Sequence, residues 1–350
     1  MPELEELVEA ADLNALLGAV DSLAGQRAWD RLVDLAEMCE EALERGKQLW
    51  PIADHIDYRL ALDAPGDYAG SVLGPDASRF VLGPLTEVAA SSHNWRELAD
   101  HLESGVVAAY VAQERVLRGE KLAGDELAHP EVLELPMQLL DYEPTYCLAT
   151  YRRDAVEVSE PWDPDDPMQV VEPRGGLGRT AEQWAATELD EPELADALLE
   201  LVLPWISESN GAARAAVVEG DAAGAASALA VDGFSMGPLA TEEALQRMAW
   251  AGASGGAYGR RRGAALGRFL ALYTSSLISD LRWPPDWDEL GATLDQLSFY
   301  RFDEPDVGEG WILRLVVEDS EQGWAAAISA SDLVEEEAEE GGDESGGRGA

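Results

Sequence analysis

Apolar residues recur every three or four positions along much of the first half of the chain, and this spacing predicts amphipathic helices. The helices predicted in this half span residues 3–24, 28–49, 52–62, 95–103 and 105–118. The first half is therefore expected to be a helical domain.

The pattern changes near residue 146. Residues 146–151 and 155–158 have the content of strands and flank a charged turn, which predicts a short hairpin. The segment 160–179 that follows holds four prolines and three glycines and has no periodicity. We place a domain boundary in this segment, because proline and glycine interrupt regular structure.

The helical spacing returns in the second half, where helices are predicted at 180–188, 192–206, 241–251 and 260–281. Asn94 and Asp286 each stand three residues before a Glu, which predicts that both begin a helix with a capping box. A short strand is possible at 228–231. From residue 297 onward apolar residues alternate with polar ones, as in Leu313, Leu315 and Val317, and this predicts strands.

The predicted fold class is α+β and predominantly α-helical. An N-terminal helical domain with a small β element (1–158) precedes a linker (159–179). The C-terminal helical domain (180–334) is closed by a three-stranded antiparallel meander, formed by residues 297–302, 311–317 and 324–328. For the acidic tail (335–350) we expect disorder.

The composition indicates a folded, strongly acidic protein. Hydrophobic residues make up 46% of the chain, 11 residues are Trp, and the formal net charge is −45. This charge opposes binding to nucleic acid and to anionic membranes, which both attract Lys and Arg. A high-salt interior or a basic protein partner would each account for such a surface.

Several features favour the cytoplasm. The N-terminus is acidic and lacks the basic and apolar regions of a secretory signal, and the chain has only two cysteines. No apolar run reaches the roughly 18 residues that a membrane-spanning helix requires. No Walker motif is present, and no motif predicts a cofactor.

Two G-x-S-x-G strings, centred on Ser235 and Ser254, raise the alternative of a serine hydrolase. In such enzymes the serine lies at a strand-to-helix turn. The first string is followed by Pro238, which delays the next helix, and the second follows a predicted helix instead of a strand. All four histidines also precede residue 130. A glycine-rich loop is the favoured interpretation of both strings.

His93, Glu97 and His101 are spaced so that a continuous helix would place them on one face, where they could bind a metal ion. His93, however, precedes the predicted cap. We favour a capped helix with no metal.

The strongest candidate site is the arginine cluster Arg260, Arg261, Arg262 and Arg268, which follows a glycine-rich segment in an acidic chain. We expect the first three in the first turn of a helix. Cations there oppose the helix dipole unless an anion balances them. Arginine binds carboxylate or phosphate in a planar, bidentate way. The anion would be one of the protein's own carboxylates or belong to an acidic protein or small anionic ligand.

Much of the chain resembles conserved hypothetical proteins of high-GC actinobacteria. The similarity rests on strings such as ERGKQLWPIADHIDYRLAL (44–62), LGPLTEVAASSHNW (82–95) and ASGGAYGRRRGAALGR (253–268). The resemblance implies a bacterial, cytosolic setting and no particular activity. The sequence therefore favours a non-catalytic interaction or scaffold protein whose arginine cluster binds an anionic group.

Overall fold

The computed structural model describes residues 2–74, 83–161, 186–230, 234–304 and 310–334. Within these ranges the protein is mostly helical and contains a two-stranded and a six-stranded sheet.

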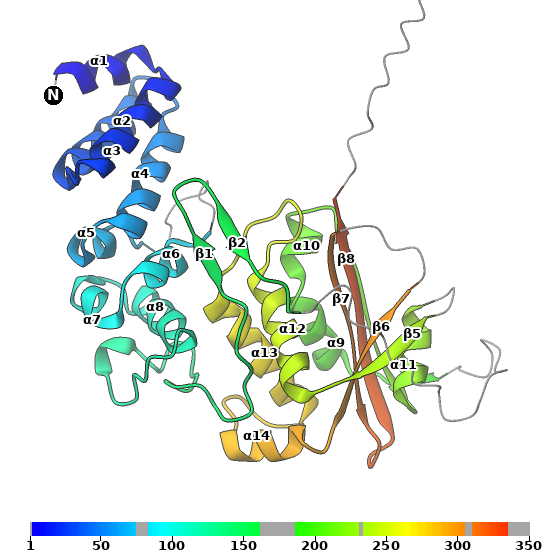
Figure 1. The fold of residues 1–350 in the computed structure, drawn as a ribbon. Helices are drawn as coiled ribbons and strands as arrows, with labels where there is room; N and C mark the ends of the chain where they lie inside the picture. Colours follow the sequence, from blue (N-terminus) through cyan, green and yellow to red (C-terminus); the bar gives the residue numbers. More distant parts are fainter. Residues whose placement is uncertain (1, 75–82, 162–185, 231–233, 305–309, 335–350) are drawn as a thin grey trace, which may run out of the picture.

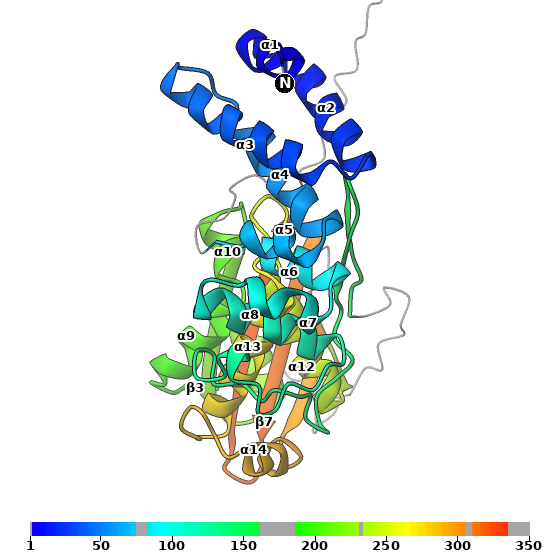
Figure 2. The same cartoon turned by 90° about the vertical axis from the view of Figure 1, so that its left-hand side faces the viewer.

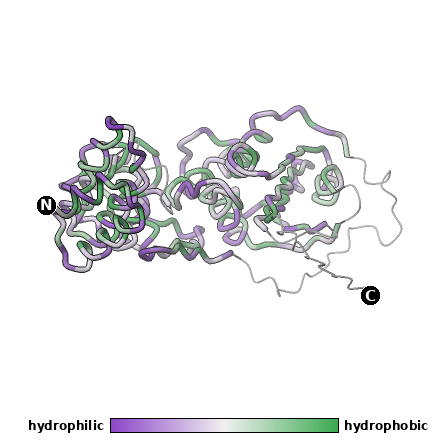
Figure 3. Tube along the Cα trace, turned by 90° about the horizontal axis from the view of Figure 1, so that it is seen from above, coloured by the Kyte–Doolittle hydropathy of each residue, from purple (hydrophilic) through white to green (hydrophobic). Residues whose placement is uncertain are grey.

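Eight α-helices are found among the described residues of the first half, and they run in sequence from the far end of the molecule toward the sheet (Figures 1 and 2). They are α1 (Pro2–Ala10), α2 (Leu13–Gly25), α3 (Trp29–Glu44), α4 (Trp50–Asp63), α5 (Gly66–Ser71), α6 (Leu85–Ser92), α7 (Trp95–Leu98) and α8 (Gly105–Leu117). Helices α1 to α4 share a core of buried apolar side chains, several of them leucines. Seen from above, they occupy one end of an elongated molecule (Figure 3).

The predicted hairpin is confirmed, and Asn94 and Asp286 both cap a helix as predicted, but of the two only Asn94 forms the full capping box. Strands β1 (Ala149–Tyr151) and β2 (Val156–Val158) pair in antiparallel fashion. The Asn94 side chain accepts a hydrogen bond from the Glu97 N–H, and Glu97 in turn accepts one from the Asn94 N–H. Asp286 accepts hydrogen bonds at the start of α14 (Trp287–Leu294).

The C-terminal sheet has six antiparallel strands in the order β3-β4-β8-β7-β6-β5. The strands are β3 (Thr187–Glu188), β4 (Ala212–Glu219), β5 (Ser235–Leu239), β6 (Ser298–Asp303), β7 (Gly310–Asp319) and β8 (Trp324–Leu333). The predicted meander is present as β6, β7 and β8. The prediction that the sheet contains only these three strands is wrong, because β4 adds to β8 and β5 adds to β6.

Helices cover both faces of this sheet. The others in this half are α9 (Pro192–Glu200), α10 (Leu203–Ser207), α11 (Ala222–Leu229), α12 (Thr241–Ala253) and α13 (Ala264–Ile278). Leu313, Leu315 and Val317 of β7 belong to the core that contains residues of α9, α12 and α13, whereas Val316 packs with the alanines of α11. This is the alternation that a pleated strand requires. Figure 1 shows α12 and α13 between the sheet and the N-terminal helices.

The largest core contains residues from both halves of the chain. Leu117, Leu133 and Tyr146 pack in it together with residues of α9, α12, α13 and the sheet. Where the domain boundary falls stays a prediction, since most of the expected linker and the whole acidic tail lie outside the described residues.

Three local predictions are wrong. Thr187 and Glu188 form strand β3, so the helix predicted at 180–188 does not extend through them. Residues 228 and 229 end helix α11 and are not part of a strand. Helix α13 begins at Ala264, so Arg260, Arg261 and Arg262 precede the helix and do not form its first turn.

Candidate functional site

The side chain of Arg261 crosses from the loop before α13 to helix α6. Its Nε and Nη2 each donate to one carboxylate oxygen of Glu87, at 2.8 Å. The side chain of Glu87 is fully buried, and that of Arg261 is 9% exposed. Burial alone would lower the pKa of Arg261, but the charge of Glu87 and its hydrogen bonds raise that pKa above the ordinary value. Both directions of shift, with the pKa of Glu87 below its ordinary value, favour the ionised pair.

The carboxylate of Glu87 accepts two further hydrogen bonds. Tyr151 Oη donates to it at 2.7 Å, and so does the backbone N–H of Ala264 at 3.3 Å. Burial would raise the pKa of Glu87, but the charge of Arg261 and the hydrogen bonds from Arg261 and Tyr151 outweigh it and keep this pKa below its ordinary value.

A second glutamate meets the first turn of α13. Glu114 of α8 accepts a hydrogen bond from the Ala265 N–H at 2.6 Å and another from Arg118 Nη1 at 2.6 Å. Burial, followed by the charge of Glu87, raises the pKa of Glu114 to about 7. The N-terminus of α13, where two N–H groups would otherwise lack partners, is thus capped by carboxylates from α6 and α8.

Arg268, one turn further along α13, is fully buried. It donates to both oxygens of Glu143 at 2.7 Å, to Gln113 Oε1 at 2.6 Å, and to the carbonyl oxygens of Pro136 and Gln138 at 3.0 Å. These five hydrogen bonds equal the number of N–H groups on a guanidinium. We call the buried groups Arg261, Arg268, Glu87, Glu114 and Glu143 the charged junction.

The other two arginines of the cluster lie outside the charged junction. Arg262 Nη2 contacts Glu200 Oε1 at 3.3 Å, with the glutamate 43% exposed. The side chain of Arg260 is exposed, and its backbone N–H donates to Glu208 at 3.4 Å. The structure thus gives Arg261, Arg262 and Arg268 carboxylate partners within the chain.

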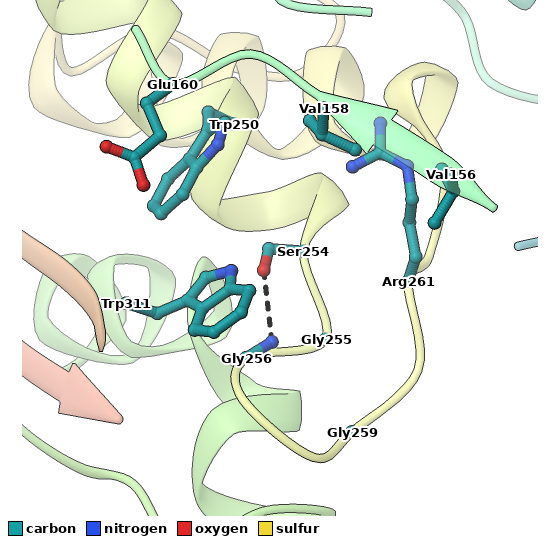
Figure 4. Close-up of a pocket in the computed structure, with 10 residues that line it drawn as sticks. All are labelled: Val156, Val158, Glu160, Trp250, Ser254, Gly255, Gly256, Gly259, Arg261 and Trp311. Carbon is teal, nitrogen blue, oxygen red and sulfur yellow. Dashed lines mark hydrogen bonds between the residues drawn. The ribbon is translucent and has the colours of Figure 1, made fainter. Parts of the chain in front are cut away.

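A pocket of about 230 Å³ opens beside Arg261 (Figure 4). Four segments form it: alternate residues of β2 and its continuation, Trp250 of α12, the loop from Ser254 to Arg261 before α13, and Trp311 of β7. We call it the tryptophan pocket, and its lining residues are Val156, Val158, Glu160, Trp250, Ser254, Gly255, Gly256, Gly259, Arg261 and Trp311.

The glycines of this loop are required by close packing. A Cβ on Gly255 would overlap the backbone of Arg260, and one on Gly256 would overlap the Asp332 carboxylate. Gly256 also has φ +77°, a conformation that other residues rarely adopt. Several loop N–H groups are already bonded: that of Ala257 to Asp332, at 2.6 Å, and that of Tyr258 to Ser209 Oγ, at 3.1 Å.

Beneath Gly256 lie two buried polar atoms that lack a hydrogen-bond partner among the described residues. They are Oδ1 of Asp332 and Nε1 of Trp205. Asp332 is fully buried and Trp205 is 1% exposed. Asp332 is paired in register with Trp311 across β8 and β7, so both side chains project from the same face of the sheet.

Ser254 lies in the tryptophan pocket, but its geometry is not that of a nucleophile elbow. It follows the end of α12, is 6% exposed, and its Oγ accepts a hydrogen bond from the Gly256 N–H at 3.0 Å (Figure 4). Ser235 lies in strand β5, opposite Asp303. Among the described residues, no histidine donates to or accepts from either serine.

His93, Glu97 and His101 do not form a metal site. His93 Nε2 lies 2.7 Å from the Ala64 carbonyl oxygen and Glu97 caps α7, which ends at Leu98 and continues as a 3-10 turn through His101. The continuous helix that would align the three residues is therefore absent. In the parts of the chain that the structure describes, no three His, Cys, Asp or Glu side chains are placed to share a metal ion.

The acceptors of the charged junction were not predicted from the sequence. Glu87 lies in the mostly apolar stretch LTEVAA, and Glu114 lies in YVAQERV among the apolar positions of a predicted helix. A carboxylate on the buried face of a helix requires a partner, so this pattern was the available signal. Arg118, four residues after Glu114, is a local partner, whereas Arg261 lies 174 residues from Glu87 and had no local signature.

The fold and site define a mixed, mostly helical protein in which buried ion pairs join the N-terminal helices to a helix-covered antiparallel sheet. A family model described as "Family of unknown function (DUF6183)" matches residues 14–332, so the chain belongs to this family. This confirms the expected membership of an uncharacterised family. No curated protein and no solved structure matches the chain. None of the helices in the described ranges has the length and apolar composition needed to cross a bilayer.

Proposed function

We propose that this protein is a non-catalytic cytoplasmic binding protein in which the charged junction holds α6 and α8 against α13 and so forms one wall of a ligand pocket. The anionic groups that Arg261 and Arg268 bind are, in this proposal, the protein's own carboxylates. The tryptophan pocket is the surface through which the protein interacts with its ligand.

The observation that carries the proposal is the Arg261–Glu87 ion pair. It joins residues 174 positions apart, and it lies in the wall of the pocket. Two of the three guanidinium nitrogens of Arg261 donate to Glu87. An acidic macromolecule would have to displace a fully buried carboxylate to reach them, at a cost of several kcal/mol.

The structure gives no support to catalysis by Ser254, the one candidate nucleophile that lines the pocket. Its hydroxyl is buried and bonded to a backbone N–H, and no base lies within hydrogen-bond distance in the described residues. A nucleophilic serine requires an adjacent base and an exposed oxygen.

The proposal is tested by replacing Arg261 and, as a matched control, its exposed neighbour Arg260. We expect Arg261→Met to lower the free energy of unfolding by about 3–5 kcal/mol, because Glu87 would stay buried without its partner. Arg260→Gln should change it by less than about 0.5 kcal/mol. Urea unfolding followed by tryptophan fluorescence measures both, and an unchanged stability in Arg261→Met would overturn the role of the charged junction.

The non-catalytic part of the proposal has a separate test. A fluorophosphonate probe labels activated serines, and we expect it to label neither Ser254 nor Ser235 in the folded protein. Labelling that disappears in Ser254→Ala or in Ser235→Ala would overturn the proposal and support a hydrolase.

A further inference from the structure

We infer that the tryptophan pocket binds a small organic cation, whose ammonium or quaternary ammonium group lies against Trp250 and Trp311 and beside the carboxylate of Glu160. The inference rests on the proposed function, since it names the ligand class of the same pocket.

The first support is the pair of indole rings. Trp250 comes from α12 and Trp311 from the start of β7, and Figure 4 shows both rings beside the space next to Ser254, with the Glu160 carboxylate near Trp250. Trp250 is held in place by an edge-to-face contact with Trp205, with ring centroids 5.9 Å apart. Organic cations bind to the faces of such rings, and tryptophan is the strongest of the aromatic partners.

The second support is the balance of charge around the pocket. The one cationic side chain of the lining, Arg261, is neutralised by its bidentate contact with Glu87. Glu160 is exposed and makes no ion pair with any residue that the structure describes. The ionic group that the pocket leaves available is therefore a carboxylate.

The third support lies beneath the pocket floor. Asp332 is fully buried under Gly256, its Oδ2 accepts from the Ala257 N–H, and its Oδ1 has no partner within the described residues. No arginine, lysine or histidine of the described ranges forms an ion pair with it. Its unpartnered Oδ1 is a hydrogen-bond acceptor, so the groups beneath the floor add no positive charge to the pocket. The charge of −45 on the whole chain attracts a cation and opposes an anion.

The size and lining of the pocket limit the ligand further. A volume of about 230 Å³ is smaller than most drug-sized sites, so the ligand is a small molecule. Val156 and Val158 supply apolar contact on the side of β2, and Ser254 supplies a hydroxyl group. A methylated ammonium group with a short polar arm, as in choline, matches this combination of surfaces.

The test compares probes of matched shape and different charge by isothermal titration calorimetry on the full chain. The probes are choline, its uncharged carbon analogue 3,3-dimethyl-1-butanol, and the anion 3,3-dimethylbutanoate. We expect choline to bind saturably and the two analogues to bind at least about 10-fold more weakly, because only choline gains cation–π and carboxylate contacts.

Variants then locate the binding. Trp311→Leu should weaken choline binding by about 10-fold or more, and Glu160→Gln by about 3–10-fold. Glu191→Gln, which removes an exposed carboxylate that lines a different pocket, is the matched control and should leave binding unchanged. Glu160 is exposed, so its variant keeps the test decisive even if Trp311→Leu does not fold.

Each contrary result has a defined meaning. Absence of saturable choline binding, or choline binding that is unchanged in Glu160→Gln, overturns the inference. If the uncharged or anionic analogue binds as tightly as choline and loses affinity in Trp311→Leu, the pocket binds ligands of another class, so the inference falls while the proposed function stands. Labelling of Ser254 by the fluorophosphonate probe would overturn the proposed function itself.

Discussion

The charged junction and the N-terminal bundle of α1 to α4 use the same types of charged residue in opposite ways. In the junction, Arg268 and Glu143 are both fully buried. In the bundle, Arg59 donates to Asp21 and Asp63, whose side chains are 36% and 39% exposed. The comparison teaches that the environment of the carboxylate sets the importance of an ion pair, because an exposed carboxylate that loses its partner is hydrated and a buried one is not.

The carboxylates are buried in one region and exposed in the other because the two regions pack against different surroundings. The bundle closes on a core of apolar side chains. The junction instead lies where α6 and α8 meet the start of α13, a helix end whose N–H groups need acceptors. The carboxylates of Glu87 and Glu114 are these acceptors. Because the carboxylates are buried, arginines are required to balance their negative charge.

The largest expected effect is that of Arg268→Met. Removing the guanidinium leaves Glu143 buried without a counter-charge and leaves Gln113 and two carbonyl oxygens without their donor. We expect the free energy of unfolding to fall by about 3–5 kcal/mol. Urea unfolding monitored by circular dichroism measures it.

A double variant shows whether the loss of stability comes from the unpaired charge of Glu143 or from the loss of Arg268 itself. Arg268→Met with Glu143→Leu removes both charges, and it should recover a substantial part of the lost stability, because an apolar pair can replace a buried ion pair at little cost. A single variant that costs less than about 1 kcal/mol would contradict the contrast drawn between the two regions.

Glycine positions provide a second contrast, between the loop that leads into the charged junction and the bundle. Gly256 and Gly46 have nearly equal φ values, +77° and +79°, but nothing lies within 4 Å of a Cβ on Gly46, whereas one on Gly256 would overlap Asp332. We expect Gly46→Ala to cost about 1 kcal/mol, from backbone strain alone. Gly256→Ala should cost about 2–4 kcal/mol, because overpacking adds to that strain. Thermal unfolding of the two variants tests this, and equal losses would show that the loop moves freely.

The next effect is a dependence of stability on pH that originates in the bundle. Burial, followed by the charges of Glu40 and Asp54, raises the pKa of Asp57 to about 7, above its ordinary value of 3.8. Between these values the folded state binds more protons than the unfolded state, so this contribution is present below about pH 4 and is lost as the pH rises through 7. Asp57→Asn should therefore reduce the fall in stability between pH 5 and pH 8 by about 1–2 kcal/mol.

Urea unfolding at pH 5, 6, 7 and 8 measures this slope. Part of it should survive in Asp57→Asn, because the pKa of Glu114 is also raised to about 7 and acts in the same direction. Glu37→Gln, an exposed position on α3, is the control and should keep the full slope. If Asp57→Asn also keeps it, the assignment to Asp57 is wrong.

The sequence predicts well what depends on local periodicity. Helices α1 to α4, α7 and α8, the hairpin and the strands β6, β7 and β8 lie where the spacing predicts helices and strands, although residues 3–24 form two helices. Helices α5 and α6 were not predicted. Strand β4 was missed because its sequence, AARAAVVE, is rich in alanine, which favours helices over strands. It is a strand because β8 pairs along its whole length. Strand β5 holds Gly237 and Pro238 and is possible only at the edge of the sheet.

The site is predictable only in part, for the same reason. The arginine cluster stands out in an acidic chain, but the helix-dipole argument for a nearby anion assumed a helix that includes Arg260, and α13 begins only at Ala264. The carboxylates that contact this part of the chain, Glu87 and Glu114, are brought there by the packing of helices that are distant in the sequence. The tryptophan pocket combines β2, α12 and β7, so no single stretch of sequence contains it.

The smallest loss of stability is expected for Arg59→Met, which removes an ion pair of the bundle. Methionine keeps most of the apolar stem of Arg59, and water can solvate Asp21 and Asp63 when the guanidinium is gone. We expect a loss of at most about 1 kcal/mol in the free energy of unfolding. Repeating the urea titration in 1 M NaCl should reduce this loss, because salt screens exposed pairs, while the loss in Arg268→Met should persist. A loss in Arg59→Met that matches that of Arg268→Met and resists salt would mean that burial of the carboxylate does not distinguish the two regions.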